Sequence, residues 1–289
     1  MIKRICLFLM VLLAISCSGP APEPASGHLY IIGGGGRTDA MIERMVDLAG
    51  GENARILVIT TASGYPQDTG VYQAGQFQAH GAAWSSWVHI TGQNADQDSI
   101  LQLIESATGI FFSGGDQRRL TRAMNDSPAL QAIRKLYQNG GLVAGTSAGA
   151  AVMSRHMITG TELANPDSTH PFGDILAENM EIWDGFGFVD EAIIDQHHIR
   201  RKRFNRLLSA TLENPEKLGI GIDETTALIV YPDRTAEVHG VRSVLIIDAR
   251  YAQDIHTDPD GRLRSRGVVL HVLGAGDRID LRTGKVTAS

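Results

Sequence analysis

The sequence predicts an α/β fold, in which a mostly parallel sheet is sandwiched by helices and extra strands follow toward the C-terminus. Three observations lead to this prediction. Short apolar runs alternate with helix-like stretches from residue 28 to about residue 150, which is the order of strands and crossover helices in a parallel sheet. Polar and glycine residues follow several of these runs, where ligands sit in such sheets. After residue 215 short strand-like runs follow one another, separated by turn residues.

The composition narrows the range of functions. Hydrophobic residues make up 43% of the 289 residues, enough for a substantial core, and the formal net charge of −6 does not favour nucleic acid as a partner. The two cysteines, Cys6 and Cys17, both lie in the N-terminal segment. The body of the protein therefore has no disulfide and no cysteine metal cluster, and we expect neither a metal nor a cofactor.

The N-terminus has the features of a targeting segment. Lys3 and Arg4 precede a continuous apolar run over residues 5–15, which is too short to span a bilayer comfortably. The run ends in small residues and Cys17, and this pattern resembles a bacterial lipoprotein signal. An ordinary secretory signal is the alternative. The resemblance implies a signal peptide over residues 1–16 and lipidation of Cys17. A tether rich in Pro, Ser and Gly then covers residues 17–27, and a single domain covers residues 28–289. The lipid would hold this domain at the bacterial cell envelope, on its periplasmic or extracellular face.

The first helix-like stretch illustrates how the elements are recognised. Apolar side chains at Met41, Ile42, Met45 and Val46 recur every three or four residues and so form one face of a helix. The strand-like runs are continuously apolar, as expected when helices cover both faces of a sheet. We expect strands at residues 28–32, 55–60, 84–90, 109–112 and 141–144, and helices at residues 38–49, 71–79, 99–107, 118–124 and 128–138.

Four glycines, residues 33–36, follow the first expected strand. A glycine-rich turn in this place can hold a phosphate group. The run lacks the GxGxxG spacing with a later ribose-binding acid, and it lacks the GK[S/T] ending of a P-loop. We therefore do not expect a nucleotide site.

The sequence Gly-Thr-Ser-Ala-Gly at residues 145–149 lies between a buried strand and a small-residue helix. This context is typical of a nucleophile elbow, in which a sharp turn exposes a serine above the sheet edge. Ser147 is then a candidate nucleophile, and the N–H of Ala148 points to where an oxyanion forms. A strand-to-helix turn whose serine only caps the helix would have the same pentapeptide.

A serine nucleophile needs a base, and His197 has the most suggestive surroundings of the histidines after residue 149. An apolar run that begins at residue 192 ends in Asp195, Gln196 and His197. We expect a helix to begin soon afterwards, with five basic residues in its first turns. Because the helix dipole disfavours cations there, these residues suggest a bound anion or carboxylate, although a solvated basic face is the alternative.

Strand-like runs dominate the last quarter of the sequence. The run at residues 218–222 ends in two acids, of which Glu224 is a candidate to orient His197. Asp223 and Glu224 are equally compatible with a simple turn. Further strands are expected at residues 227–231, 236–240, 244–248 and 268–273.

Four motifs occur together in order: Ser-Gly-Gly-Asp-Gln at 113–117, Gly-Thr-Ser-Ala-Gly-Ala at 145–150, Asp-Gln-His followed by arginines at 195–206, and Gly-Ile-Gly-Ile-Asp-Glu at 219–224. With these motifs the chain resembles the cyanophycinase family of serine peptidases over about residues 28–280. The resemblance implies a class I glutamine-amidotransferase-like fold. It also implies a serine exopeptidase that hydrolyses β-aspartyl-arginine linkages of cyanophycin and releases β-Asp-Arg dipeptides.

The resemblance also implies a role for individual residues. Ser147 is the nucleophile, His197 the general base and Glu224 its orienter. This Ser, His, Glu order differs from that of α/β-hydrolases. The N–H groups of Gly115 and Ala148 form the oxyanion hole. An aspartyl substrate is bound by a further set of side chains: Gln117, Asp195, Arg201, Arg203 and Arg206.

Three positions depart from the family pattern. Gly36 stands where an acid is expected, His198 where an aromatic residue is frequent, and Lys202 where a glycine is common. These departures leave the substrate open, so an α-aspartyl or other acidic-dipeptide peptidase is the first alternative. A lipid-anchored binding protein without turnover is an alternative of another class. The expected partners are a peptide substrate and, through the lipid anchor, a membrane, and a homodimer is compatible with the resemblance. A glutamine amidotransferase is disfavoured, because Ser147 occupies the position of the cysteine nucleophile that such an enzyme needs.

Overall fold

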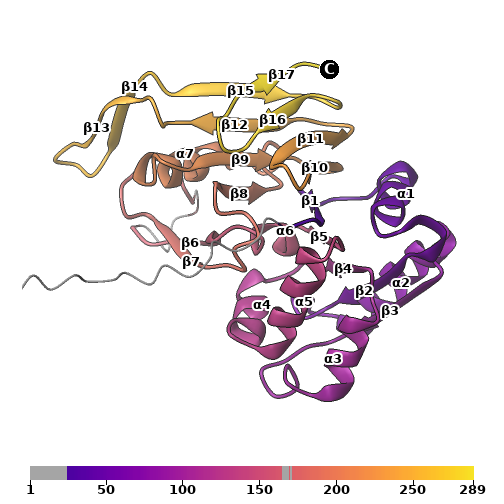
Figure 1. The fold of residues 1–289 in the computed structure, drawn as a ribbon. Helices are drawn as coiled ribbons and strands as arrows, with labels where there is room; N and C mark the ends of the chain where they lie inside the picture. The colour runs from indigo at the N-terminus through magenta and orange to yellow at the C-terminus, as the bar shows by residue number, and fades with distance from the viewer. Residues whose placement is uncertain (1–24, 165–168, 170) are drawn as a thin grey trace, which may run out of the picture.

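The computed structural model describes residues 25–164, 169 and 171–289 (Figure 1). The signal-like segment, Cys17 and most of the tether lie outside this part of the chain. The main sheet has nine strands in the order β17-β16-β11-β10-β1-β5-β4-β2-β3. The five parallel strands are β1 (His28–Ile32), β2 (Arg55–Ile59), β3 (Trp84–Val88), β4 (Gly109–Phe112) and β5 (Leu142–Thr146).

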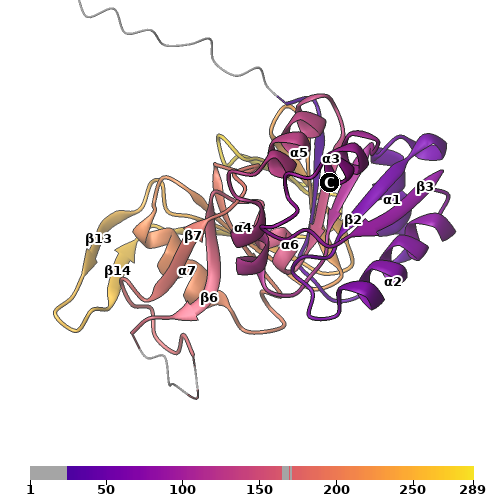
Figure 2. The same cartoon turned by 90° about the horizontal axis from the view of Figure 1, so that it is seen from below.

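Helices cover both faces of this parallel region (Figure 2). Alternate residues of one strand enter different cores: Tyr30 packs on the side of α1 and α2, whereas Leu29 and Ile31 pack on the side of α3 to α6. This explains why the strands read as continuous apolar runs. The helices are α1 (Asp39–Leu48), α2 (Pro66–Ala79), α3 (Asp98–Glu105), α4 (Gln117–Met124), α5 (Pro128–Gln138) and α6 (Ala148–Ala151), with a short 3-10 turn η1 (Gly51–Asn53).

Most of the C-terminal strands lie in two sheets. Four of them extend the main sheet in antiparallel fashion: β10 (Thr226–Val230), β11 (Thr235–Gly240), β16 (Arg278–Asp280) and β17 (Val286–Thr287). A second sheet has the order β15-β12-β9-β8, and in the view of Figure 1 it lies above β1 to β5 and overlaps the antiparallel strands of the main sheet. Its strands are β8 (Ala192–Gln196), β9 (Leu218–Ile222), β12 (Val244–Asp248) and β15 (Val269–Leu273). The predicted fold class, a mostly parallel sheet between helices with extra C-terminal strands, is confirmed.

The second sheet uses its two faces differently. Ile194 and Ile220 join the large core shared with the main sheet, whereas Ile193 and Ile247 pack against Leu207 on α7 (Phe204–Glu213). Parallel pairing of β8 with β9 brings the ends of both strands to one place. That place holds the residues that follow each strand, which include His197 and Glu224.

Two hairpins were not expected from the sequence: β6 (His156–Glu162) with β7 (Met180–Asp184), and β13 (Gln253–Thr257) with β14 (Leu263–Arg266). The helix after His197 also begins later than expected, at Phe204. Lys202 has a φ of 54°, which ends any helical path there. The expectation that five basic residues occupy the first helical turns is therefore wrong, because Arg200 to Lys202 lie in the preceding turn.

Among the described residues, none of the helices combines the length and apolar character that a membrane crossing requires.

Candidate active site

Ser147 lies between β5 and α6 in the strand–turn–helix context that the sequence predicted. Its φ of 54° and ψ of −108° are strained for a residue with a side chain. The turn is tight because glycines allow the backbone to pass closely: a Cβ on Gly145 would lie 2.4 Å from the carbonyl oxygen of Gly149. This conformation places Ser147 at the carboxyl end of the parallel strands, above the sheet edge.

His197 connects Ser147 to Glu224. Its Nε2 lies 2.9 Å from Ser147 Oγ, and its Nδ1 lies 2.7 Å from Glu224 Oε1. With the proton on Nδ1, the ring donates to Glu224 and its Nε2 is free to accept the serine proton. His198 points away, into the protein, so only one of the two histidines reaches Ser147.

The glycine run after β1 encloses this pair of side chains. A Cβ on Gly34 would lie 2.3 Å from Cε1 of His197, and one on Gly35 would lie 2.9 Å from Cβ of Glu224. The carbonyl oxygen of Gly33 accepts a hydrogen bond from the backbone N–H of His197 at 2.6 Å. The glycine run, for which the sequence predicted no nucleotide site, therefore packs against the histidine and the glutamate.

The surroundings of His197 favour the neutral ring. Burial lowers the pKa of His197, Glu224 opposes this, and the positive charges of Arg201 and Arg203 lower it further. A neutral imidazole can accept a proton, so the pKa shift keeps the base active at neutral pH.

A cavity of about 330 Å³ opens beside Ser147. Arg203 lies on its wall, where the Nη1 group donates to the backbone oxygen of Gln196 at 2.8 Å and to its Oε1 at 2.7 Å. Burial, and then the nearby charge of Arg206, lowers the pKa of Arg203 to about 10. The cavity is lined by Gly115, Asp116, Gln117, Arg118, Ser147, Thr159, Gly160, Gln196, Arg201, Arg203 and Arg206.

Asp195 and Arg206 form a buried ion pair at the back of this cavity. Arg206 Nε donates to Asp195 Oδ2 at 3.0 Å, and its Nη2 donates to Oδ1. Burial alone would raise the pKa of Asp195, but the charge of Arg206 and the hydrogen bond from His198 hold it well below its usual range. Asp195 therefore pairs with one of the arginines, and its predicted role in positioning that arginine for a substrate stays a prediction.

Gln117 and Gly115 also line the cavity at Ser147. The Gln117 amide donates to the backbone oxygens of Ile158 and Thr159 at 2.9 and 2.8 Å, so it ties α4 to β6 while it lines the cavity. Gly115 has a φ of 141°, and a Cβ there would lie 1.9 Å from the carbonyl oxygen of Ala62. Only glycine fits at this position, next to the serine.

Several lining residues were missed from the sequence. Gln196 anchors Arg203, and Arg118 forms an ion pair with Asp116 at the cavity wall. Gln196 directly precedes the predicted base His197, and its position in the same motif could have identified it as a site residue. Thr159 and Gly160 come from the unexpected β6–β7 hairpin, for which the local sequence gave no signal.

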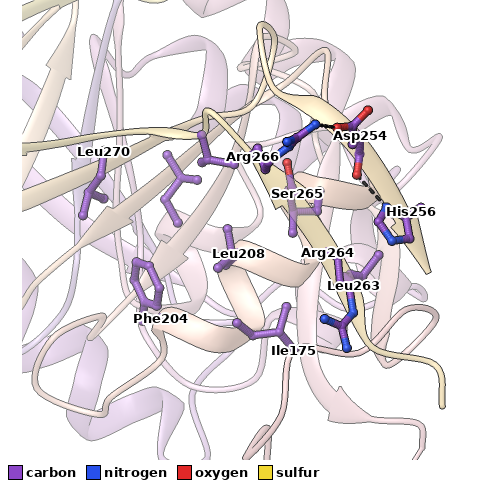
Figure 3. Close-up of a pocket in the computed structure, with 13 residues that line it drawn as sticks. Ile175, Phe204, Leu208, Asp254, His256, Leu263, Arg264, Ser265, Arg266 and Leu270 are labelled. Atoms are coloured by element: carbon purple, nitrogen blue, oxygen red, sulfur yellow. Dashed lines mark hydrogen bonds and ion pairs between the residues drawn. The ribbon is translucent and has the colours of Figure 1, made fainter. Parts of the chain in front are cut away.

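A larger pocket of about 1020 Å³ lies elsewhere, between α7 and the β13–β14 hairpin (Figure 3). Its floor is apolar, with Phe204 and Leu208 from α7, and its rim carries charged side chains such as Arg264. It shares no lining residue with the cavity at Ser147. Because the reactive side chains converge on the smaller cavity, we place the active site there.

Known proteins resemble this chain closely enough to identify its family. The cyanophycinase of Geminocystis herdmanii (strain PCC 6308) is 35% identical over 248 residues, covering 84% of this chain and 88% of that protein. The cyanophycinase of Synechococcus elongatus is 34% identical over 276 residues, covering 90% and 82%. That of Trichormus variabilis (strain ATCC 29413 / PCC 7937) is 33% identical over 273 residues, covering 90% and 87%.

Solved structures of peptidases share the fold. A peptidase from an acI-B1 Actinobacterium has a TM-score of 0.66 at 23% identity, covering 89% of this chain and 98% of that one. A putative peptidase E from Listeria monocytogenes EGD-e has a TM-score of 0.52 at 15% identity, covering 74% and 98%. The sequence profile of peptidase family S51 matches residues 29–238. By this match and by its similarity to the cyanophycinases, the chain belongs to peptidase family S51, a family of serine peptidases.

Proposed function

We propose that this peptidase degrades cyanophycin and releases β-Asp-Arg dipeptides, with Ser147 as the nucleophile, His197 as the general base and Glu224 as its orienter. The observation that carries the proposal is the hydrogen-bonded series Ser147–His197–Glu224, which opens onto an arginine-lined cavity. Relatives named cyanophycinases, 33–35% identical over most of the chain, support the substrate.

The products determine which bond breaks. In cyanophycin each main-chain aspartate carries an arginine on its side-chain carboxyl group. A β-Asp-Arg dipeptide that leaves intact must be freed by cutting the main-chain amide between successive aspartates. The proposed scissile bond is therefore this amide, and not the β-aspartyl-arginine linkage that the sequence led us to expect.

Two successive acyl transfers complete the reaction. Ser147 Oγ attacks the aspartyl carbonyl carbon while His197 Nε2 accepts the hydroxyl proton. The N–H groups of Gly115 and Ala148 stabilise the oxyanion. The carbon–nitrogen bond then breaks, His197 protonates the leaving amine, and an ester to Ser147 remains. Water, deprotonated by His197, cleaves this ester to a carboxylic acid, and the proton returns to Ser147.

The arginines supply recognition. Each cyanophycin unit has a free carboxylate on its arginine, and the terminal unit has a second. A planar guanidinium binds a carboxylate through two parallel hydrogen bonds, for which Arg201 and Arg203 are available at the cavity wall. Arg206 completes the positive wall while Asp195 holds it in place.

A peptidase for α-aspartyl or other acidic dipeptides is the second candidate. The same guanidinium groups would bind any carboxylate, and a cavity of about 330 Å³ suits a single dipeptide unit. A binding protein without turnover is disfavoured, because it would not need the aligned hydrogen bonds at Ser147.

Incubation with cyanophycin and with α-linked aspartyl dipeptides, followed by mass spectrometry of the products, distinguishes these functions. We expect β-Asp-Arg from cyanophycin. The Ser147→Ala variant should lose about 10⁴-fold or more in kcat, because only oxyanion stabilisation and binding remain. Hydrolysis of the dipeptides alone would favour the second candidate, and full activity of Ser147→Ala would refute the assigned nucleophile.

We also propose that the mature protein is a lipoprotein held at the cell envelope through Cys17. The basic start, the short apolar run and the small residues before Cys17 support this proposal.

A further inference from the structure

A buried polar network lies behind the arginine side of the cavity, and one of its members has no part in the proposed chemistry. Besides Asp195 and Arg206, the network contains His198, whose Nδ1 lies 3.2 Å from Asp195 Oδ2. His198 and Asp195 are each only 1% exposed. The two adjacent histidines therefore face different partners: His197 faces Ser147, and His198 faces the carboxylate that holds Arg206.

The hydrogen bond from His198 completes the coordination of Asp195. Oδ1 accepts from the backbone N–H of Gln196 at 2.8 Å and from Arg206 Nη2, while Oδ2 accepts from Arg206 Nε and from His198. A carboxylate has about four acceptor positions, so these four contacts fix both its oxygens. Loss of the His198 donor would leave Oδ2 with Arg206 Nε as its one remaining donor among these four contacts, and one acceptor position of a buried carboxylate would be unfilled.

The position of His198 is built for a ring. Gly221 lies next to Asp195 in the β8–β9 register, and a Cβ on it would lie 2.4 Å from Cδ2 of His198. Glycine inside a strand weakens the sheet and marks a close approach of another group. Nε2 of His198 has no hydrogen-bond partner among residues 25–164, 169 and 171–289, so Nδ1 is the nitrogen that the site uses there.

We propose that His198 is a positioning residue for substrate binding. Through its hydrogen bond to Asp195 it fixes the orientation of Arg206. Arg206 and Arg203 together form the positively charged cavity wall that receives a substrate carboxylate. This inference rests on the proposed function only in that the cavity binds carboxylates. It assigns a task to a residue that departs from the family pattern, and it separates this task from proton transfer at His197.

The test uses the full-length protein and three variants. His198→Phe keeps a ring but removes the donor. His198→Asn keeps a donor near Nδ1, and Gly221→Ala displaces the ring. A fluorophosphonate probe labels Ser147, and L-aspartate serves as the competing carboxylate; the half-protecting concentration is measured for each protein. Without L-aspartate, we expect the probe to label all four proteins at equal rates. The half-protecting concentration of L-aspartate should be roughly ten-fold higher for His198→Phe and Gly221→Ala than for the wild type. For His198→Asn it should stay within about two-fold of the wild-type value.

Thermal unfolding shows which variants fold, and Gly221→Ala tests the same contact if His198→Phe does not fold. Three results would overturn the inference: equal protection of wild type and His198→Phe, equal losses in His198→Phe and His198→Asn, or no protection of the wild type. Cyanophycin turnover is measured separately. If the variants follow the expected order but the wild type leaves cyanophycin intact, the proposed substrate is wrong and the role of His198 stands.

Discussion

The charges around His197 determine the pH range in which the base can act. Burial and the charges of Arg201 and Arg203 lower the pKa of this histidine. The neutral form is the base, so kcat/KM should fall only as the pH drops below about 6.5, the ordinary value for histidine. Replacement of Arg201 by glutamine removes one of the charges that lower the pKa. The acid limb of the kcat/KM profile should then move to higher pH.

A neighbouring lysine provides the matched control. Lys202→Gln removes the same charge one residue away, and Lys202 is not among the main groups that shift the pKa of His197. Its pH profile should overlay that of the wild type. The measurement is kcat/KM between about pH 4.5 and 8 at constant ionic strength, since salt screens such charges. Equal shifts in both variants would show that the net charge of the protein, and not the position of Arg201, determines the pH at which kcat/KM falls.

Among the elements, the loop after β1 gives the sharpest comparison. A methyl group on Gly34 would meet the His197 ring at 2.3 Å, and Gly34 has a φ of 108°. Gly36 has open space within 4 Å of its would-be Cβ and is free of this backbone constraint. Gly34→Ala should therefore move the base and lower kcat by about 100-fold, the effect of a misplacement of about 1 Å. Gly36→Ala should retain wild-type kcat, and comparable losses in both variants would exclude ring displacement as the cause.

The ion pair between β8 and α7 should dominate the local stability. The side chains of Arg206 and Asp195 are 4% and 1% exposed. Arg206→Met leaves an unpaired buried carboxylate and should lower the free energy of unfolding by about 3–5 kcal/mol. The control is Arg155→Met, which breaks a pair with Asp190 whose side chains are 58% and 56% exposed. That change should cost less than about 1 kcal/mol in urea unfolding, and equal losses would contradict the assigned difference in burial.

Elements with a strong local pattern could be predicted from the sequence. The strands β1, β2, β4 and β5 match the expected runs, because their apolar residues are buried on both faces. The start of α7 could not be predicted, because Lys202 adopts a left-handed backbone conformation and the Arg203 side chain donates a hydrogen bond to the backbone oxygen of Gln196. The β6–β7 hairpin pairs segments separated by a long connection, so nothing local marks it.

The candidate site followed the same division. His197 and Glu224 were proposed as partners of Ser147 because they lie in sequence motifs. In the structure His197 is within hydrogen-bond distance of both Ser147 and Glu224. The wall from β6 and the arrangement of His198 on Gly221 depend on contacts between distant segments. No residue pattern along the chain reports such contacts. The catalytic roles and the substrate remain predictions for the experiments above.

At the scale of the whole molecule, the site depends on two sheets. Ser147 follows β5 of the main sheet, His197 follows β8 of the second sheet, and Glu224 follows β9 beside it. The backbone N–H of His197 bonds to Gly33, which follows β1, so the two sheets are joined within the site itself. Packing between the sheets therefore sets the distance between nucleophile and base.

The position of β1 also determines how an anchored molecule would present its site. His28 begins β1, and its backbone N–H bonds to Gly141 at the amino end of the parallel strands. Ser147 lies at their carboxyl end, about one strand length of roughly 17 Å away. An anchor that reaches the domain through His28 is thus attached at the end of the sheet opposite the active site.

We therefore expect the lipid anchor and the active site to be separable. Cys17→Ser should remove the proposed acylation site and release the protein from bacterial membranes, because acyl chains on the cysteine are the proposed attachment to lipid. Its kcat and KM on cyanophycin should equal those of the detergent-solubilised wild type, since β1 enters the sheet at the end opposite Ser147. The measurements are fractionation of cells with antibody detection, intact mass of the N-terminal peptide, and kinetics of both proteins. If Cys17→Ser still sediments with membranes, the attachment lies elsewhere in the chain; if it is released but loses activity, the tether contributes to the site.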